Sequence, residues 1–381
     1  MTIDGCRTFS ISYSFRTEKM KKSLLALALL GTFTGMTYAQ SNVTLYGVVD
    51  TGLIKETGTD VRMGSNVESR LGFRGVEDLG SGLKASFELE HRFNLNDGTG
   101  SDAYNFDDLA HSNKTPDWRG AANVGLKSDL WGAVRLGRVN DLSVETYRRI
   151  DPFNQYGVGA SLSKTPLYSE QLSNTIRYDS PDWKGFSFGA TYSLGADDHD
   201  NIDYKLNGND GFAVNLKYDN GPLLLLANYD RLADSNKSWL WNAGAAYQWQ
   251  NLTFSVGYQD STLKLQDFDE DAGDIDHYGT KQKNWLVGLQ YKTGPHTVSA
   301  SYNYGRVKTE GNSNKVNKYA LGYTYSLSKR TSLYANIAYS DYDNEWLSNY
   351  YRNDMAVMND SENEAANASV TGIQIGITHR F

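Results

Sequence analysis

Apolar and polar side chains alternate along the chain from residue 43 to residue 381. In residues 252–258, for example, Leu, Phe, Val and Tyr occupy every second position, and Thr, Ser and Gly lie between them. Consecutive side chains of a β-strand point to opposite faces, so this period of two predicts a strand with one apolar face and one polar or small face. About 16 such strands are predicted, near residues 43–54, 68–77, 83–93, 119–127, 133–139, 173–180, 186–194, 211–218, 223–229, 238–249, 252–259, 283–291, 296–304, 317–326, 331–340 and 369–381.

The connections between these segments alternate between short and long. Tight-turn signals lie at residues 77–82, 180–185, 219–222, 292–295 and 327–330. This asymmetry is typical of an outer-membrane barrel, which has short turns at one end and long loops at the other. We therefore predict an all-β fold, a single 16-stranded antiparallel transmembrane β-barrel. The long polar loops are expected at residues 94–118, 195–210, 230–237, 259–282, 305–316 and 341–368.

Composition supports this interpretation. Apolar residues make up only 39% of the chain, although aromatic residues reach 13%. A barrel needs apolar side chains on only one face of each strand, and a lumen of this width holds water and not a packed core. The alternative is a soluble β-sandwich or lectin. That alternative does not explain why so many apolar faces end in an aromatic residue, as membrane-interface girdles do: Tyr192, Tyr218, Tyr229, Trp249, Tyr258, Tyr291, Tyr304, Tyr325 and Tyr339.

The first 39 residues have the pattern of a cleaved signal peptide. Three lysines precede an apolar run at residues 24–30, and small residues, Thr37 and Ala39, stand before Gln40. We expect residues 1–39 to be an N-terminal extension and signal peptide with its start at Met20, and residues 40–381 to be the barrel. Cys6, the single cysteine, lies in this leader. The mature chain then has no thiol for a disulfide, a zinc–thiolate site or a cysteine nucleophile.

Charge and motifs exclude several classes of function. The formal charge is −8, and it becomes −11 without the leader, which holds five basic and two acidic residues. Such acidity argues against a nucleic-acid partner. The acidic run at residues 267–276 departs from the EF-hand spacing and is predicted to be a solvated external loop, with divalent bridging to lipopolysaccharide as an alternative. We predict no metal site and no cofactor. An outer-membrane hydrolase using His199, which stands among aspartates, is the enzymatic alternative.

Basic side chains fall on the face of the strands that should line the lumen. Leu71 and Phe73 occupy the apolar face of the 68–77 segment, so Arg70 and Arg74 face the water. The same rule places Arg135 in the lumen. Arg138 has the opposite parity, but it stands at a strand end, where either a bulge or a role at the membrane interface would account for it.

An alternating last strand that ends in Phe381 resembles the signal read by the outer-membrane assembly machinery. Six segments across the mature chain carry a wider resemblance: residues 43–50, 69–85, 124–127, 135–138, 174–181 and 376–381. Together they resemble the general diffusion porins of Gram-negative bacteria, in particular the beta-proteobacterial branch. The resemblance implies a homotrimer of 16-stranded barrels and a third loop that folds inward to form a constriction.

In this family, strand arginines face acidic residues of the third loop across the constriction. Here that loop corresponds to residues 140–170, and the resemblance makes Asp151 the first candidate for the acidic side, followed by Asp141 and Glu145. Two positions where the family often has arginine hold Gly120 and Gln171, which predicts a thinner basic wall.

The resemblance therefore implies passive diffusion of ions and small hydrophilic solutes across the outer membrane, without an enzymatic step or a cofactor. Its expected partners are outer-membrane lipid and lipopolysaccharide, two further copies of the chain, and the assembly machinery. A substrate-specific channel for a sugar or an organic acid is the first alternative, and a plugged barrel with a structural role is the second.

Overall fold

A computed structural model describes residues 42–100, 117–163, 170–194, 210–232, 238–269, 274–309, 312–344, 347 and 369–381. The predicted signal peptide and His199 lie outside the described residues, and so do the side chains of the acidic run at residues 267–276.

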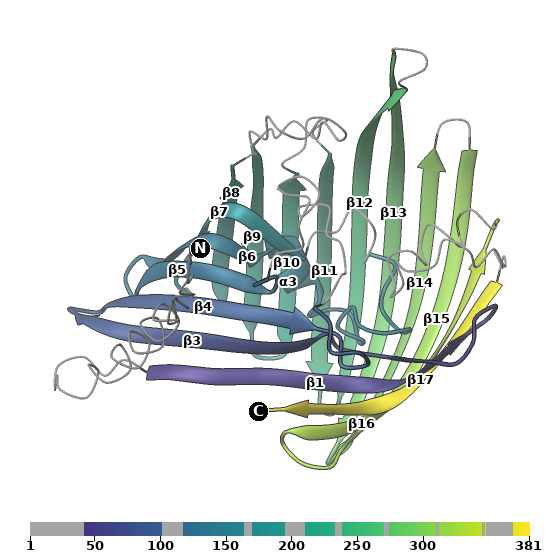
Figure 1. Ribbon diagram of the computed structural model, residues 1–381, viewed down its shortest axis with the longest axis horizontal. Coiled ribbons are helices and arrows are strands. Elements are labelled where there is room, and N and C mark those ends of the chain that lie inside the picture. Colours follow the sequence, from purple (N-terminus) through teal and green to yellow (C-terminus); the bar gives the residue numbers. More distant parts are fainter. Residues whose placement is uncertain are drawn as a thin grey trace, which may run out of the picture. The chain divides into compact units, whose positions relative to one another are not determined.

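In this part of the chain, sixteen long antiparallel strands follow one another around a ring (Figure 1). β1 pairs with β3 on one side and with β17 on the other, so the sheet closes on itself. The predicted all-β barrel is confirmed. Its strands are β1 (Asn42–Glu56), β3 (Ser69–Gly80), β4 (Leu83–Phe93), β5 (Ala121–Ser128), β6 (Gly132–Asn140), β7 (Gln171–Asp179), β8 (Phe186–Ser193), β9 (Gly211–Asn220), β10 (Leu223–Arg231), β11 (Trp239–Trp249), β12 (Leu252–Asp269), β13 (Asp274–Thr293), β14 (His296–Thr309), β15 (Asn312–Ser326), β16 (Thr331–Tyr342) and β17 (Ser369–Arg380).

Three features of the strands differ from the prediction. A short strand, β2 (Arg62–Gly64), pairs with the end of β1. The predicted loop at residues 259–282 is mostly strand, because β12 and β13 continue to pair as far as Asp269 and Asp274. Most of the predicted loop at 305–316 is likewise strand in β14 and β15. Polar residues predominate in these segments, so the apolar–polar alternation by which the other strands were predicted is weak there.

The barrel is inverted relative to a soluble protein, with apolar residues outside and polar residues inside. On β12, Val256 is 53% exposed, whereas Ser255 and Gln259 on the opposite parity are buried. Aromatic rings adjoin one another across the outer face of neighbouring strands, at centroid distances of 5.0–5.3 Å. The chain of rings runs through Trp241, Tyr258, Trp285 and Tyr304.

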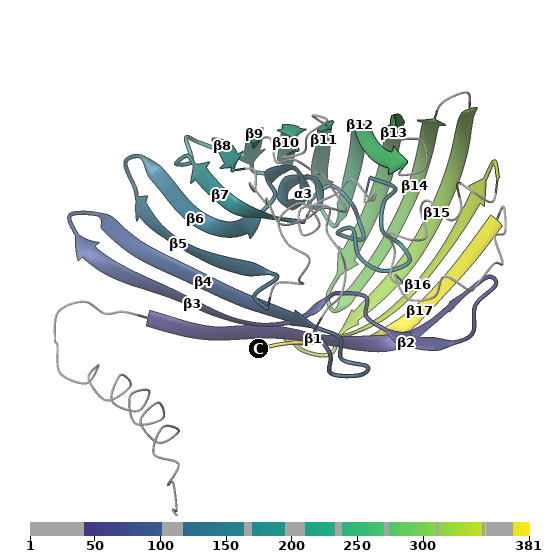
Figure 2. The ribbon, with the colours of Figure 1, turned by 45° about the horizontal axis from the view of Figure 1, so that its top comes forward.

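The lumen contains the segment that joins β6 to β7. It begins with a short helix, α3 (Leu142–Tyr147), which lies within the curve of the strands (Figure 2) and contacts β8, β9, β10 and β11. The predicted inward-folded third loop is therefore confirmed. Among the described residues, no helix has the length and apolarity needed to cross a membrane.

Candidate functional site

The third loop lies against glycines of the inner wall, which leave room for its apolar side chains. A Cβ atom added at Gly244 of β11 would overlap the Cδ1 of Ile150. One added at Gly257 of β12 would lie 2.7 Å from the same atom and 2.5 Å from the Tyr147 hydroxyl. Tyr147 and Ile150 are almost fully buried there. Small inward residues thus fix where the loop crosses the lumen.

Wall side chains also hold the returning part of the loop through its backbone carbonyls. Asn284 Nδ2 donates to the Leu162 carbonyl at 2.9 Å, and Lys318 Nζ donates to the Ala160 carbonyl at 2.7 Å. These donors come from β13 and β15. The loop therefore covers the inner wall from β8 round to β17, where the Val158 N–H donates to Gln374 Oε1 at 3.2 Å. The opposite wall is formed by β3 to β7.

That opposite wall carries the predicted arginines. Arg70 lies on β3 with 16% of its side chain exposed, and its Nη1 is 3.9 Å from the Glu90 carboxylate. Arg74 is exposed, and its guanidinium lies over the Tyr46 ring at 5.1 Å from the centroid. Arg135 on β6 donates to the Asp179 carboxylate at 2.6 Å.

The predicted bulge near Arg138 is present, because the pairing of β6 with β7 shifts register between Gly137 and Val139. The shift turns Arg138 to the buried side, where its Nε donates to the Arg119 carbonyl at 2.7 Å. The Arg138 Nη1 donates to Ser173 Oγ at 2.6 Å. These bonds tie β6 to the neighbouring segments of the wall.

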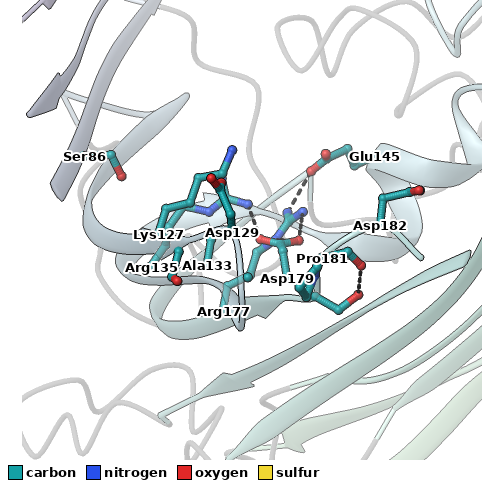
Figure 3. Close-up of a pocket in the computed structure, with 13 residues that line it drawn as sticks. Ser86, Lys127, Asp129, Ala133, Arg135, Glu145, Arg177, Asp179, Pro181 and Asp182 are labelled. Carbon is teal, nitrogen blue, oxygen red and sulfur yellow. Dashed lines mark hydrogen bonds and ion pairs between the residues drawn. The ribbon is translucent and has the colours of Figure 1, made fainter. Parts of the chain in front are cut away.

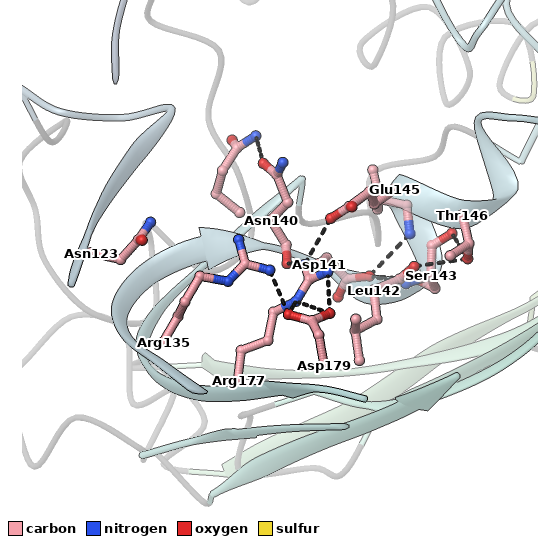
Figure 4. Close-up of polar contacts among 12 residues, drawn as sticks. Asn123, Arg135, Asn140, Asp141, Leu142, Ser143, Glu145, Thr146, Arg177 and Asp179 are labelled. Carbon is pink, nitrogen blue, oxygen red and sulfur yellow. Dashed lines mark hydrogen bonds and ion pairs between the residues drawn. The ribbon is translucent and has the colours of Figure 1, made fainter. Parts of the chain in front are cut away.

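Of the three acidic candidates, Glu145 is the exposed one. Its side chain is 47% exposed, and its carboxylate accepts from Arg177 Nη1 at 2.7 Å. Figure 4 shows Arg177 pointing between Glu145 on α3 and Asp179 on β7. An acidic residue of the loop thus meets a basic residue of the wall. The family resemblance implies such an opposition at the constriction, although Arg177 was not among the residues it pointed to.

Asp141 and Asp151 are buried inside the loop, each 3% exposed. Asp141 caps α3 by accepting from the backbone N–H groups of Ser143 and Val144 at 2.7 and 3.1 Å. Asp151 accepts from the backbone N–H groups of Phe153, Gln155 and Ser161 at 2.9–3.0 Å. Burial raises the pKa of both carboxyl groups, although these hydrogen bonds oppose the shift. Both residues shape the loop and present little surface to a solute.

Two members of this constellation were absent from the predicted set. Arg177 and Asp179 lie on the inward parity of β7, and exposed Ile176 lies on the opposite parity. The alternation along β7 places both side chains on the same inner face as Arg135, and this pattern in the sequence could have identified them. Arg177 and Arg135 stand directly opposite each other in the β6–β7 pairing, and the Asp179 carboxylate bonds to both.

A cavity of about 590 Å³ is lined by Glu145 of α3 and by residues of the β5–β6 and β7–β8 turns. Figure 3 shows Lys127 and Arg135 on one side of it and Glu145 and Asp182 on the other. Among the described residues, no group of three or more His, Cys, Asp or Glu side chains could hold a metal ion. The arrangement is suited to passing ions and dipolar solutes along charged walls.

A closed barrel with an apolar outside, a polar inside and a charged loop across its lumen defines a membrane channel of the porin type. A family model described as Gram-negative porin matches residues 26–345 of the chain. The chain belongs to the Gram-negative porin family.

Individual proteins similar to this chain are also porins. The chain is 30% identical to an outer membrane porin protein of Bordetella pertussis, with 95% of this chain and 100% of the relative covered. It is also 30% identical, with the same coverage, to outer membrane porin protein 32 of Delftia acidovorans. Among solved structures, it resembles an anion-selective porin from Comamonas acidovorans with a TM-score of 0.69 and 25% identity, covering 90% of this chain and 100% of that one.

The predicted family, barrel, outer-membrane location and porin function are therefore confirmed. The protein is an outer-membrane porin, and its family is one of channels.

Proposed function

We propose that this porin is a general diffusion channel, which passes ions and small hydrophilic solutes down their concentration gradients through a constriction between the third loop and the β3–β7 wall. The observation that carries the proposal is that Glu145 of the loop lines the same cavity as Arg135 and Arg177 of the wall. Charges of opposite sign across a narrow aqueous path create a transverse field, which orients dipolar solutes without binding one of them tightly.

The lumen aromatics favour this proposal over a sugar-specific channel. A sugar path needs exposed ring faces, but Tyr147 and Phe153 are buried in the loop's contact with the wall. The Tyr46 ring lies under Arg74, and the Tyr156 ring lies under Arg148 at 4.7 Å. Guanidinium groups thus occupy ring faces on which a sugar would otherwise stack.

Conductance in planar bilayers tests the proposal. We expect large ohmic single-channel steps that stay proportional to salt concentration and are not saturated by any one sugar or organic acid. Saturable block by a single solute at low concentration would support a specific channel. A folded, inserted barrel without conductance would support the structural role.

We also propose how the protein reaches and occupies the membrane. Residues 1–39 are removed as a signal peptide, the barrel assembles as a homotrimer, and lipopolysaccharide contacts its external loops. N-terminal sequencing of membrane-extracted protein should begin at Gln40, and the native mass in detergent should correspond to three chains. A sequence that begins before residue 40, or a monomer mass, would contradict these two points.

A further inference from the structure

The arginine wall carries its own carboxylates. Arg92 of β4 lies directly opposite Arg70 of β3, a like-charge pairing that is unfavourable in isolation. Glu90 lies between them, 3.0 Å from Arg92 Nε and 3.9 Å from Arg70 Nη1. A strand-borne carboxylate thus offsets the repulsion between the two guanidinium groups.

Two further glutamates, Glu68 and Glu170, extend this network from outside the strands. Glu68 stands just before β3 and contacts both Arg92 and Arg119, the latter at 2.7 Å. Glu170 stands just before β7 and contacts Arg92 and Arg148, each at 2.9 Å. Each of these glutamates therefore bridges two arginines, and Glu170 joins the wall to the third loop.

The arginines and Glu170 at the centre of this network are buried, whereas Glu68 at its edge is partly exposed to solvent. The side chains of Arg92 and Arg119 are 3% exposed, that of Glu170 is 9% exposed and that of Glu68 is 23% exposed. Within the described residues, four guanidinium groups share three carboxylates. The field that such a wall projects into the pore is much weaker than four unopposed arginines would give.

We propose that Glu68 and Glu170 are specificity-determining residues that limit the preference of this pore for anions by neutralising the arginine wall. The inference rests on the proposed diffusion function and assigns selectivity to acids on the wall, in addition to Glu145 on the loop. A purely structural role for these glutamates would change the stability of the wall and leave the reversal potential unchanged.

The test uses Glu68→Gln in the full-length porin, reconstituted in a planar bilayer under a KCl gradient. Removing one carboxylate beside the water path should raise the anion-to-cation permeability ratio about twofold at moderate ionic strength. The double variant Glu68→Gln/Arg119→Gln removes one charge of each sign and should return the ratio to the wild-type value. Asp60→Asn, an exposed aspartate between β1 and β2, is the matched control for loss of one negative charge.

The outcomes separate the two proposals. An increase for Glu68→Gln that exceeds the Asp60→Asn effect and disappears in the double variant supports the inference. A ratio unchanged from wild type, or a shift no larger than that of the control, overturns it. If Glu68→Gln does not assemble, Glu170→Gln is measured by the same criteria. Absence of ohmic conductance in the wild-type protein would instead overturn the diffusion function itself.

Discussion

The contact between the third loop and the glycines of the inner wall leads to an atom-specific prediction. Gly244→Ala adds a methyl group that overlaps Ile150 Cδ1. Ile150 and its neighbour Tyr147 are almost fully buried between the loop and the wall, so little free space surrounds this atom. We therefore expect the overlap to displace the loop. Overpacking of this kind costs about 1–3 kcal/mol, which changes the equilibrium between the docked and displaced loop by roughly 5- to 150-fold.

The substitution Ile150→Val should restore part of this loss, because it deletes Cδ1 and keeps Cγ1. The Cγ1 lies 3.4 Å from the added Cβ, which is an ordinary contact distance. Alone, Ile150→Val costs about 0.5–1.5 kcal/mol, because it leaves a small cavity. Combined with Gly244→Ala it should cost less than the sum of the two, with a favourable coupling of about 1 kcal/mol. The carbonyl of Val256, 2.9 Å from the added Cβ, keeps the rescue incomplete.

Single-channel recording measures displacement of the third loop as the fraction of time that the channel spends below its fully open conductance level. Gly244→Ala should increase that fraction, and the double variant should lower it again, while heat-modifiable mobility on gels shows that the barrel itself is folded. Gly100→Ala is the control, since a Cβ there meets nothing within 4 Å. Strictly additive effects of Gly244→Ala and Ile150→Val would refute the proposed contact between the loop and the wall.

Four other predictions follow from the site. Arg74→Ala should shift the reversal potential towards cations by more than Arg70→Ala does, because Arg74 is exposed and Arg70 lies beside Glu90; the opposite order would contradict this. Glu145→Gln should shift the reversal potential towards anions, and no shift in a salt gradient would count against Glu145 lining the constriction. Asp151→Asn turns an amide towards backbone N–H donors, so about 1–3 kcal/mol of loop stability is lost and closures become more frequent; the selectivity of the open channel should not change. Phe381→Ala keeps both backbone hydrogen bonds to Gly47 and removes only the ring, so less protein should reach the membrane in heat-modifiable form; wild-type levels would exclude the predicted assembly signal.

The barrel could be predicted from sequence alone because each residue of a membrane-crossing strand faces either lipid or the lumen. The alternation of apolar and polar residues indicates which of the two each residue faces. The same parity placed Arg70, Arg74 and Arg135 on the inner wall. It failed for β2 and for the continuation of β12 and β13 through residues 259–282, because polar residues predominate there and the alternation is weak.

The interior of the third loop was less predictable. The burial of Asp151 depends on how the loop turns back on itself to bring Ser161 to its carboxylate, which strand parity does not report. Asp141 did carry a local signal, because Asp before a short helical segment is a typical N-cap. The Glu68 and Glu170 contacts join residues up to 78 positions apart, so they become visible only once the barrel has closed.

Chemical modification of a cysteine introduced at Glu145 tests most directly whether a water path runs between the third loop and the arginine wall. The single natural cysteine lies at position 6, in the predicted leader, so the label is confined to the introduced site. A charged, water-soluble thiol reagent should change the single-channel conductance of Glu145→Cys in steps, and should leave Val256→Cys, on the outer face, unaffected. An unmodifiable Glu145→Cys, or modification without any change in current, would contradict the account.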